Sequence, residues 1–325
     1  MKLSQAISAV NAAIDADIPV MLWGAPGIGK SETVASVADA RGAAFYDIRL
    51  NLFDPVDLRG LPAMVDGRTV WLKPGIWPED ESRETVLLFD EIDRAAPAVM
   101  SAAMQIVLDR RVGEHVLPAS VRIVAAGNGK TDRAGTNRMP AALANRLCHI
   151  EIEPDVESWA AWAVQAGIDP ILVAFMRFRP ALLHVMEGGD ARSFPSPRAW
   201  SAANRVMAQP DDIRFALIAG LVGAPAAAEF EAFARVVSTL PSFADIVANP
   251  GLALVPSDPG ACYALASGLA RHATPANFGA VLEYARRMPR EFEIVTATDA
   301  VRRDKALTET AAFVAFATRN QDVTL

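Results

Sequence analysis

The sequence predicts a parallel α/β sheet sandwiched by helices, followed by an all-helical region. This fold class follows from three features of the chain. Strand, crossover and strand recur from residue 18 to 153, which is the pattern of a parallel sheet. Residues 85–89 form a continuous apolar run, as expected of a strand that is covered on both faces. From Val156 onward only helical periodicity is present, broken by loops that contain Gly and Pro.

The composition is that of a globular protein with a large core. The chain has 325 residues, 52% of them hydrophobic, which suffices for two or three domains. No apolar run approaches the roughly 20 residues that span a bilayer, and residues 1–16 lack a signal-peptide core, so a cytoplasmic protein without a membrane partner is expected. Cys148, Cys262 and the four histidines lack metal-ligand spacing, so no transition-metal site is predicted. A net charge of −7 without a Lys/Arg block does not favour nucleic acid as a partner.

The first elements alternate between helix and strand. Residues 3–16 have the apolar spacing of an amphipathic helix, which leads into a strand over residues 18–23. After a glycine-rich turn, a second helix is expected to stop at Gly42, and a second strand covers residues 43–49. The apolar stripes of the two helices consist of Leu3, Ile7, Val10 and Ile14, and of Val34, Val37 and Ala38.

The glycine-rich turn has the sequence of a phosphate-binding loop in its proper setting, between a strand and a helix. Glycines allow successive N–H groups to face an anion, and a helix beginning near Lys30 adds its positive end. Lys30 can reach the β- and γ-phosphates, and Ser31 can ligate Mg²⁺. A tight turn with a chance Lys-Ser pair explains the flanking elements less well. The expected nucleotide contacts are Gly24, Ala25, Pro26, Gly27, Ile28, Gly29, Lys30, Ser31 and Glu32.

Two adjacent carboxylates, Asp90 and Glu91, follow the apolar strand over residues 85–89. Ligands of open α/β sheets bind at the carboxyl ends of strands, which would bring these acids beside the phosphate loop. Asp90 can then hold hydrated Mg²⁺ opposite Ser31, and Glu91 can orient or deprotonate an attacking water. The alternative is that both merely begin the next helix, although Asp93 is the better N-cap residue.

Two excursions interrupt the predicted sheet. Residues 51–60 indicate a turn and a short helix, and Asp66-Gly67 lies between two extended segments, which is a strong hairpin signal. A second hairpin is expected around Gly113. From the sequence, the first excursion is either a surface for a partner or a plain surface hairpin.

A further strand over residues 121–126 delivers Asn128 to the edge at which the acidic pair lies. The amide of Asn128 can hold a γ-phosphate oxygen or the attacking water, or it can simply cap a turn. A polar loop over residues 129–139 precedes a short helix over 140–146 and a last strand over 148–153.

In the helical half, Ser196-Pro197-Arg198 has the form of an N-cap followed by the first two helical positions. Arg198 would therefore lie at the positive end of a helix, where a cation is disfavoured. An anion should compensate it. Both a nucleotide phosphate and a nearby carboxylate such as Asp190 meet this requirement.

Together these motifs resemble those of AAA+ ATPases and, more narrowly, of the MoxR-like branch. The resemblance covers roughly residues 1–230. It implies a nucleotide-binding domain over residues 1–154, a helical lid over 155–230, and a helical extension over 231–325 whose role is open. It also implies these roles: Walker A for residues 24–31, Walker B for Asp90 and Glu91, sensor 1 for Asn128, a trans-acting arginine finger for Arg146, and sensor 2 for Arg198.

The resemblance also has consequences for assembly and activity. It implies an Mg²⁺-dependent ATPase that forms a ring, expected to be a hexamer, because Arg146 would act on a neighbouring subunit. Its expected client is a protein, such as one with a von Willebrand factor A domain. A DNA-directed motor subunit is the alternative. The finger context, Ala-Asn-Arg-Leu, departs from the usual Asp-Arg-Phe and leaves Arg133 or Arg138 as substitutes.

Overall fold

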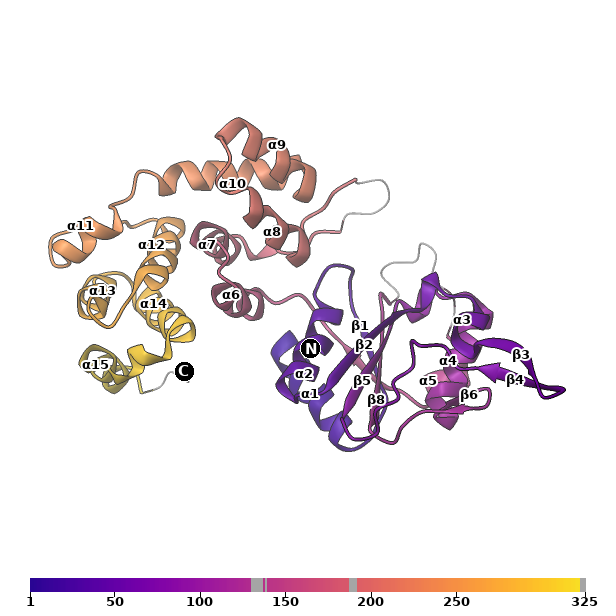
Figure 1. Ribbon diagram of the computed structural model, residues 1–325. Helices are drawn as coiled ribbons and strands as arrows, with labels where there is room; N and C mark the ends of the chain where they lie inside the picture. The colour runs from indigo at the N-terminus through magenta and orange to yellow at the C-terminus, as the bar shows by residue number, and fades with distance from the viewer. Residues whose placement is uncertain (130–136, 138, 187–191, 322–325) are drawn as a thin grey trace. The chain divides into compact units, whose positions relative to one another are not determined.

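A computed structural model describes residues 1–129, 137, 139–186 and 192–321 of the chain. It divides into two compact units, Met1–Glu153 and Pro154–Leu325, which are described separately (Figure 1). Arg133, Arg138 and Asp190, which the sequence offered as alternative or compensating residues, lie outside the described residues.

The first unit is built on a five-stranded sheet in the order β2-β5-β8-β1-β9. Every neighbouring pair in this sheet is parallel, which confirms the predicted α/β class. Strand β1, which precedes the phosphate loop, lies between β8 and β9. The strands are β1 (Val20–Trp23), β2 (Ala44–Arg49), β5 (Thr85–Asp90), β8 (Val121–Gly127) and β9 (Cys148–Glu151).

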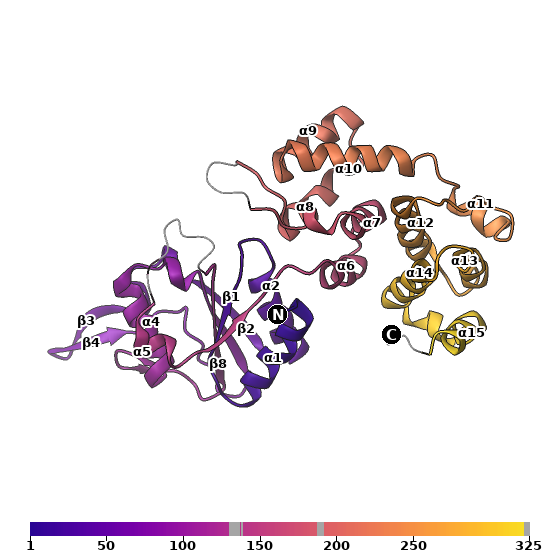
Figure 2. The same ribbon diagram turned by 180° about the vertical axis from the view of Figure 1, so that it is seen from behind.

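Helices cover both faces of the sheet because side chains along each strand alternate between them. Val86 and Leu88 of β5 pack with α1 (Leu3–Asp15) and α2 (Lys30–Ala40). Leu87 and Phe89 pack on the other face, against α4 (Pro97–Asp109) and α5 (Ala141–Ala144). Figure 2 shows α4 and α5 on one side of the sheet and α1 and α2 on the other. The carboxyl ends of the strands stay uncovered by these helices, and the candidate site lies there.

Both predicted hairpins are present. Strands β3 (Leu61–Val65) and β4 (Arg68–Leu72) form an antiparallel ribbon, and β6 (Arg111–Val112) pairs with β7 (His115–Val116). The first ribbon turns at Asp66 and Gly67, whose φ angles of 50° and 75° both lie in the left-handed region. A two-residue turn of this kind matches the twist of the flanking strands, which explains why Asp-Gly predicted it.

The short helix predicted before the first hairpin is α3 (Pro55–Arg59), with Asp54 as its N-cap. The start of α4 was predicted wrongly. That helix begins at Pro97 with Ala96 as its N-cap residue, and a 3₁₀ turn, η2 (Ile92–Arg94), separates it from β5. Pro97 sets the start because its fixed φ angle and missing N–H suit the first helical position.

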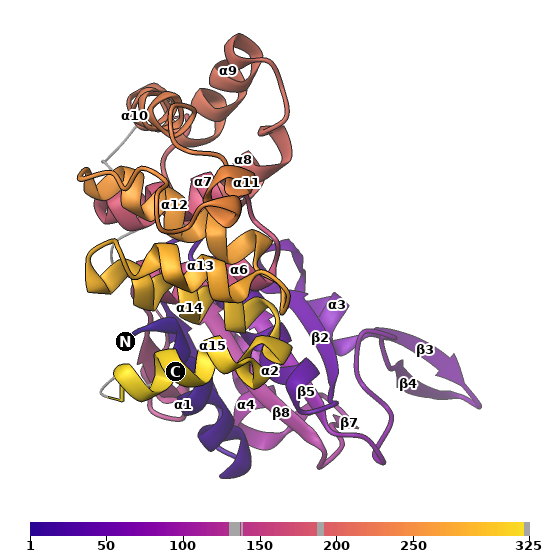
Figure 3. The same ribbon diagram turned by 90° about the vertical axis from the view of Figure 1, so that its left-hand side faces the viewer.

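The second unit is all helical, as the sequence predicts, and no described helix of either unit is long and apolar enough to cross a membrane. Figure 3 shows these helices with α13 and α15 seen from the side. They are α6 (Val156–Gln165), α7 (Pro170–Phe178), α8 (Pro197–Ala203), α9 (Asp211–Val222), α10 (Ala224–Val237), α11 (Phe243–Ala248), α12 (Pro259–His272), α13 (Phe278–Ala285), α14 (Arg290–Arg303) and α15 (Ala311–Arg319), with 3₁₀ turns η3 (Pro180–Leu182), η4 (Asn204–Val206) and η5 (Lys305–Glu309).

Two hydrophobic clusters stabilise this unit. One is centred on Phe175, Trp200 and Phe230, and the other on residues of α12 to α15. The predicted division after residue 230 falls inside α10, whose Phe230 and Phe233 both belong to the first cluster. The clusters are not separated along the chain, because Ala264 of α12 also belongs to the first cluster.

A buried ion pair joins α7 to α14. The Arg177 guanidinium donates to both carboxylate oxygens of Asp299, at 2.5 and 3.1 Å, and both side chains are almost fully buried. Burial would lower the pKa of Arg177, but its hydrogen bonds to Asp299 raise that pKa above the ordinary value. Glu157, which is exposed, adds a second and longer contact to Arg177.

We expect Asp299→Ala to lower the free energy of unfolding of the chain by about 3–5 kcal/mol, because it leaves a buried cation without its partner. Glu157→Gln is the matched control and should cost less than about 1 kcal/mol, since its carboxylate is screened by water. Urea denaturation followed by circular dichroism measures both values. Equal losses for the two variants would contradict this account of the pair.

Candidate active site

The phosphate loop connects β1 to α2 and is shaped by its glycines. Gly29 is the N-cap residue of α2 and has a φ angle of 94°, and Gly27 has a φ angle of 79°, so both occupy the left-handed region. Gly24 is required for a different reason. A Cβ atom there would lie 2.8 Å from the carbonyl oxygen of Ile152, which follows β9. Close packing against the segment that follows β9 in the same chain therefore fixes where the loop starts.

Lys30 lies at the first position of α2 and is only 7% exposed. Its Nζ atom donates hydrogen bonds to the carbonyl oxygens of Gly24 and Ala25, at 2.9 and 3.1 Å. It also donates to Oδ1 of Asn128 at 3.0 Å. Residues 98 positions apart in the sequence thus meet because β1 and β8 are adjacent, and the ammonium lies inside the loop.

Ser31 and Asp90 meet in the same way across α2 and β5. The Ser31 hydroxyl donates to Oδ2 of Asp90 at 2.7 Å, and the backbone N–H of Glu91 donates to Oδ1 at 2.9 Å. A hydroxyl and a carboxylate at this separation are hard oxygen donors of the kind that Mg²⁺ takes from proteins. The two residues expected to hold the metal ion therefore fit that ion.

The backbone turns sharply at Glu91. Its φ and ψ angles of 53° and 36° are left-handed, which is uncommon for a residue with a side chain. Its carboxylate has no hydrogen-bond partner among the described residues. Unfavourable backbone angles of this kind are concentrated at functional sites.

A second carboxylate, that of Asp47, lies close enough to Asp90 to be affected by its charge. Asp47 lies on β2, beside β5, and burial raises the pKa of its carboxyl group, as does the negative charge of Asp90. Because the pKa is raised in the folded state, ionisation of Asp47 opposes folding as the pH rises through that pKa. A divalent cation at Asp90 would relieve this repulsion.

Asp93 is a site residue whose role was predicted wrongly. Its side chain is 3% exposed, and Oδ2 accepts a hydrogen bond from the backbone N–H of Asn128 at 2.9 Å. Asp93 therefore orients Asn128 instead of capping α4. Gly127 makes room for it, since a Cβ atom at that position would lie 2.9 Å from Asp93 Oδ1. Pro97 was the signal that the helix begins later.

Arg146 is not brought to the phosphate loop. It is exposed and lies between α5 and β9, just before Cys148, whose partner in the sheet is Val20 at the start of β1. The phosphate loop follows the other end of β1. Arg146 therefore lies at the opposite edge of the sheet, and within the described ranges its side chain makes no ion pair.

Arg198 belongs to the second unit. Ser196 caps α8 by accepting a hydrogen bond from the N–H of Ala199 at 3.2 Å, and Pro197 holds the first helical position, as predicted. The side chain of Arg198 is exposed and has no ion-pair partner in the described part of the chain.

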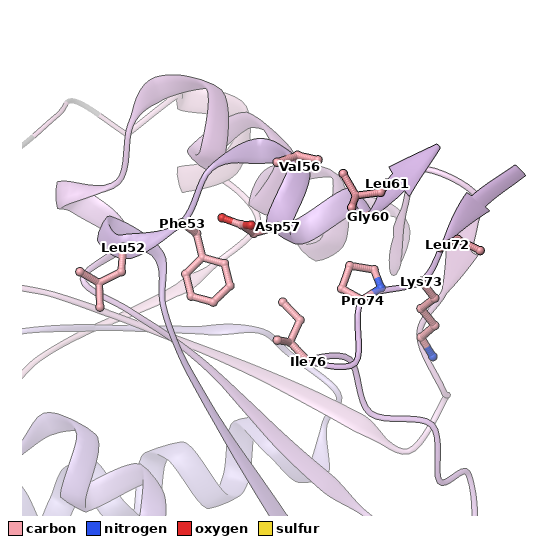
Figure 4. A pocket seen from close by; sticks show the side chains of 10 residues that line it. All are labelled: Leu52, Phe53, Val56, Asp57, Gly60, Leu61, Leu72, Lys73, Pro74 and Ile76. Carbon is pink, nitrogen blue, oxygen red and sulfur yellow. The ribbon is translucent and has the colours of Figure 1, made fainter. Parts of the chain in front are cut away.

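A second feature of the first unit is a shallow apolar pocket of about 520 Å³ at the root of the first hairpin (Figure 4). Beyond it the hairpin exposes bulky apolar side chains, including Leu61 at 63% and Met64 at 75%. The residues lining the pocket are Leu52, Phe53, Val56, Asp57, Gly60, Leu61, Leu72, Lys73, Pro74 and Ile76.

We expect Gly127→Ala to lower the free energy of unfolding by about 1–3 kcal/mol, because the added methyl group would overlap Asp93 and the tip of Met21. Gly75→Ala is the matched control, since a Cβ atom there meets nothing within 4 Å. Chemical denaturation checks both variants. An unchanged stability for Gly127→Ala would show that Asp93 is not held as described.

In the comparison with known proteins, residues 19–147 match a family model, the AAA domain (dynein-related subfamily). Midasin from Giardia intestinalis is 26% identical over 147 residues, which are 42% of this chain and 3% of midasin. This chain thus spans a small part of that relative.

Among solved structures, a RuvB mutant from Thermotoga maritima is 16% identical, with a TM-score of 0.41 over 73% of each chain. NtrX from Brucella abortus in complex with ADP is 15% identical, with a TM-score of 0.37 over 98% of this chain and 67% of NtrX. The family match covers β1, the phosphate loop and every strand up to β9. The first unit of this chain is therefore similar to the AAA domain (dynein-related subfamily) over residues 19–147.

Proposed function

We propose that this protein is an Mg²⁺-dependent ATPase of the MoxR-like branch, which forms a ring and uses hydrolysis to remodel or activate a protein partner. The observation that carries the proposal is the meeting of two pairs, Lys30 with Asn128 and Ser31 with Asp90, at one edge of the sheet. Each pair joins a residue of the phosphate loop to a residue at the end of a strand. Phosphoryl transfer requires the groups that bind the phosphates and those that position the water to lie close together in this way.

Each side chain has a role in this proposal. Lys30 would exchange its contacts with loop carbonyls for oxygens of the β- and γ-phosphates, with the N–H groups of residues 24–32 around them. Ser31 and Asp90 would hold Mg²⁺, which when bound neutralises phosphate charge. Glu91 would orient or deprotonate the attacking water, and Asn128, held by Asp93, would bind a γ-phosphate oxygen.

The two arginines would complete the site. Arg146, at the far edge of the sheet, would serve a neighbouring subunit, and head-to-tail contacts of that kind can close into rings, here a hexamer by resemblance. Arg198 would be the sensor 2 residue of a helical lid. The exposed position of both side chains supports these roles. The lid would begin at residue 155 and include α10, whose Phe230 and Phe233 belong to the first cluster.

A protein client is supported by the first hairpin. Exposed apolar side chains and the pocket at its root form the kind of surface that marks protein contacts. The resemblance to the MoxR-like branch suggests a partner with a von Willebrand factor A domain. Strong stimulation of the ATPase by DNA, in place of protein, would contradict this part of the proposal.

We expect Glu91→Gln to bind Mg-ATP with a dissociation constant close to that of the wild type, and to hydrolyse it about 10²–10⁴-fold more slowly, because the amide cannot accept a proton. Calorimetry measures binding and phosphate release measures turnover. Glu81→Gln, on an exposed loop before β5, should change neither quantity. Turnover that survives Glu91→Gln would remove that residue from its proposed role.

We expect Arg146→Ala to lower turnover by about 10³-fold or more while Mg-ATP still binds, because the finger stabilises charge only in the transition state. Mixing it with the Glu91→Gln protein should restore hydrolysis, since each variant supplies what the other lacks. Steady-state phosphate release across a series of mixing ratios measures this. Normal turnover by a strictly monomeric wild-type preparation would contradict the shared site.

A further inference from the structure

A chain of two side-chain hydrogen bonds runs across β1 and β9. The indole Nε1 of Trp23 donates to Nδ1 of His149 at 2.8 Å, and Nε2 of His149 lies 2.8 Å from the carbonyl oxygen of Ala144. The two ring planes differ by only 7°. The indole N–H and the lone pair of Nδ1 both lie in the planes of their rings, so near-parallel planes suit the hydrogen bond that joins the two rings.

The hydrogen-bond partners of His149 determine which ring nitrogen carries the hydrogen. An indole N–H can only donate and a carbonyl oxygen can only accept. Nδ1 must therefore be the acceptor, and Nε2 must carry the hydrogen that binds Ala144. His149 is thus neutral in this arrangement. It accepts a hydrogen bond from Trp23 through Nδ1 and donates one to Ala144 through Nε2.

The two hydrogen bonds begin next to the phosphate loop, at Trp23, and end next to the segment that carries Arg146, at Ala144. Trp23 directly precedes Gly24 of the phosphate loop, and its ring lies beside Gly129, which follows Asn128. Ala144 is the last residue of α5, two residues before Arg146. His149 therefore connects the nucleotide edge of the sheet to the segment that carries the arginine.

Strand pairing does not require this connection, because the backbone ladder already joins β1 to β9 over four residue pairs. The short helix α5 does need support. It spans only Ala141–Ala144, too few residues to be stable alone, and the Ala144 carbonyl at its end accepts only a long backbone hydrogen bond, 3.4 Å from the nitrogen of Leu147. The His149 imidazole adds a shorter hydrogen bond of 2.8 Å to that carbonyl and so helps to hold the turn that leads to Arg146.

We propose that His149 is a positioning residue, which couples the phosphate loop of a subunit, through Trp23 and Ala144, to the arginine that the same subunit presents to its neighbour. This inference rests on the proposed function. It adds a connection within one subunit, through which nucleotide binding at its own phosphate loop affects the rate of hydrolysis in the adjacent subunit. Arg146 touches the phosphates in this scheme, and His149 acts only through it.

The test uses mixed rings of full-length chains. Arg146→Ala subunits act as acceptors with an intact nucleotide site, and Glu91→Gln subunits act as donors that bind ATP and present Arg146. A second substitution is placed in the donor alone: His149→Asn, which keeps an acceptor for Trp23, His149→Gln, which can still reach Ala144, or Trp23→Phe, which removes only the indole N–H. Cys148→Ser, on the exposed neighbouring position of β9, is the matched control.

We expect each of the three donor changes to lower the restored turnover by about fivefold, as loss of one hydrogen bond implies. Cys148→Ser should restore turnover fully, and calorimetry should show that every donor still binds Mg-ATP. Trp23→Phe is decisive, because it lies on the nucleotide side and far along the chain from Arg146. Full restoration by this donor would overturn the coupling and reduce His149 to a support for α5.

The same experiment separates the two proposals. If donors with an unaltered His149 fail to restore turnover, the shared site itself is wrong, and the role of His149 falls with it. If those donors succeed and the His149 and Trp23 donors succeed equally well, the shared site stands and only the coupling is refuted.

Discussion

The site depends on the accommodation of one buried charge, the ammonium of Lys30. A cation with little exposure to water must find hydrogen-bond acceptors, and here two loop carbonyls and the amide oxygen of Asn128 supply them. The carbonyls exist at these positions because glycines let the loop fold around its own lysine. The amide exists because β8 lies next to β1. The contacts of Lys30 therefore depend both on the shape of the loop and on the order of the strands. A triphosphate that replaces these acceptors would change the contacts of Lys30 with the loop and with Asn128.

Much of this arrangement could be predicted because it follows from local rules. Apolar runs fixed the buried strands, Asp-Gly fixed the first hairpin, and glycines before Lys30 fixed the phosphate loop. Since parallel strands share their carboxyl edge, the sequence also indicated that Asp90 and Asn128 would end near that loop. The described contacts of Ser31 and Lys30 agree with this geometry.

What the sequence missed depends on tertiary contacts. Asp93 looked like a helix cap, because carboxylates near helix starts are usually caps. Its real partner, the N–H of Asn128, is 35 residues away and is reached only once β5 and β8 pair. The link from Trp23 to His149 spans 126 residues and has no local signal at all. The predicted boundary after residue 230 likewise falls inside α10, because Phe230 and Phe233 pack into one cluster.

The left-handed backbone at Glu91 has a consequence for how variants of this protein should be judged. Glycine adopts these angles without strain, whereas glutamate adopts them at a cost of the order of 1 kcal/mol. Selection by thermal tolerance alone would therefore favour glycine at this position, and the survivors would keep their sheet while losing the carboxylate. In a library of variants of this protein, the most stable variants and the active variants would therefore be different sets.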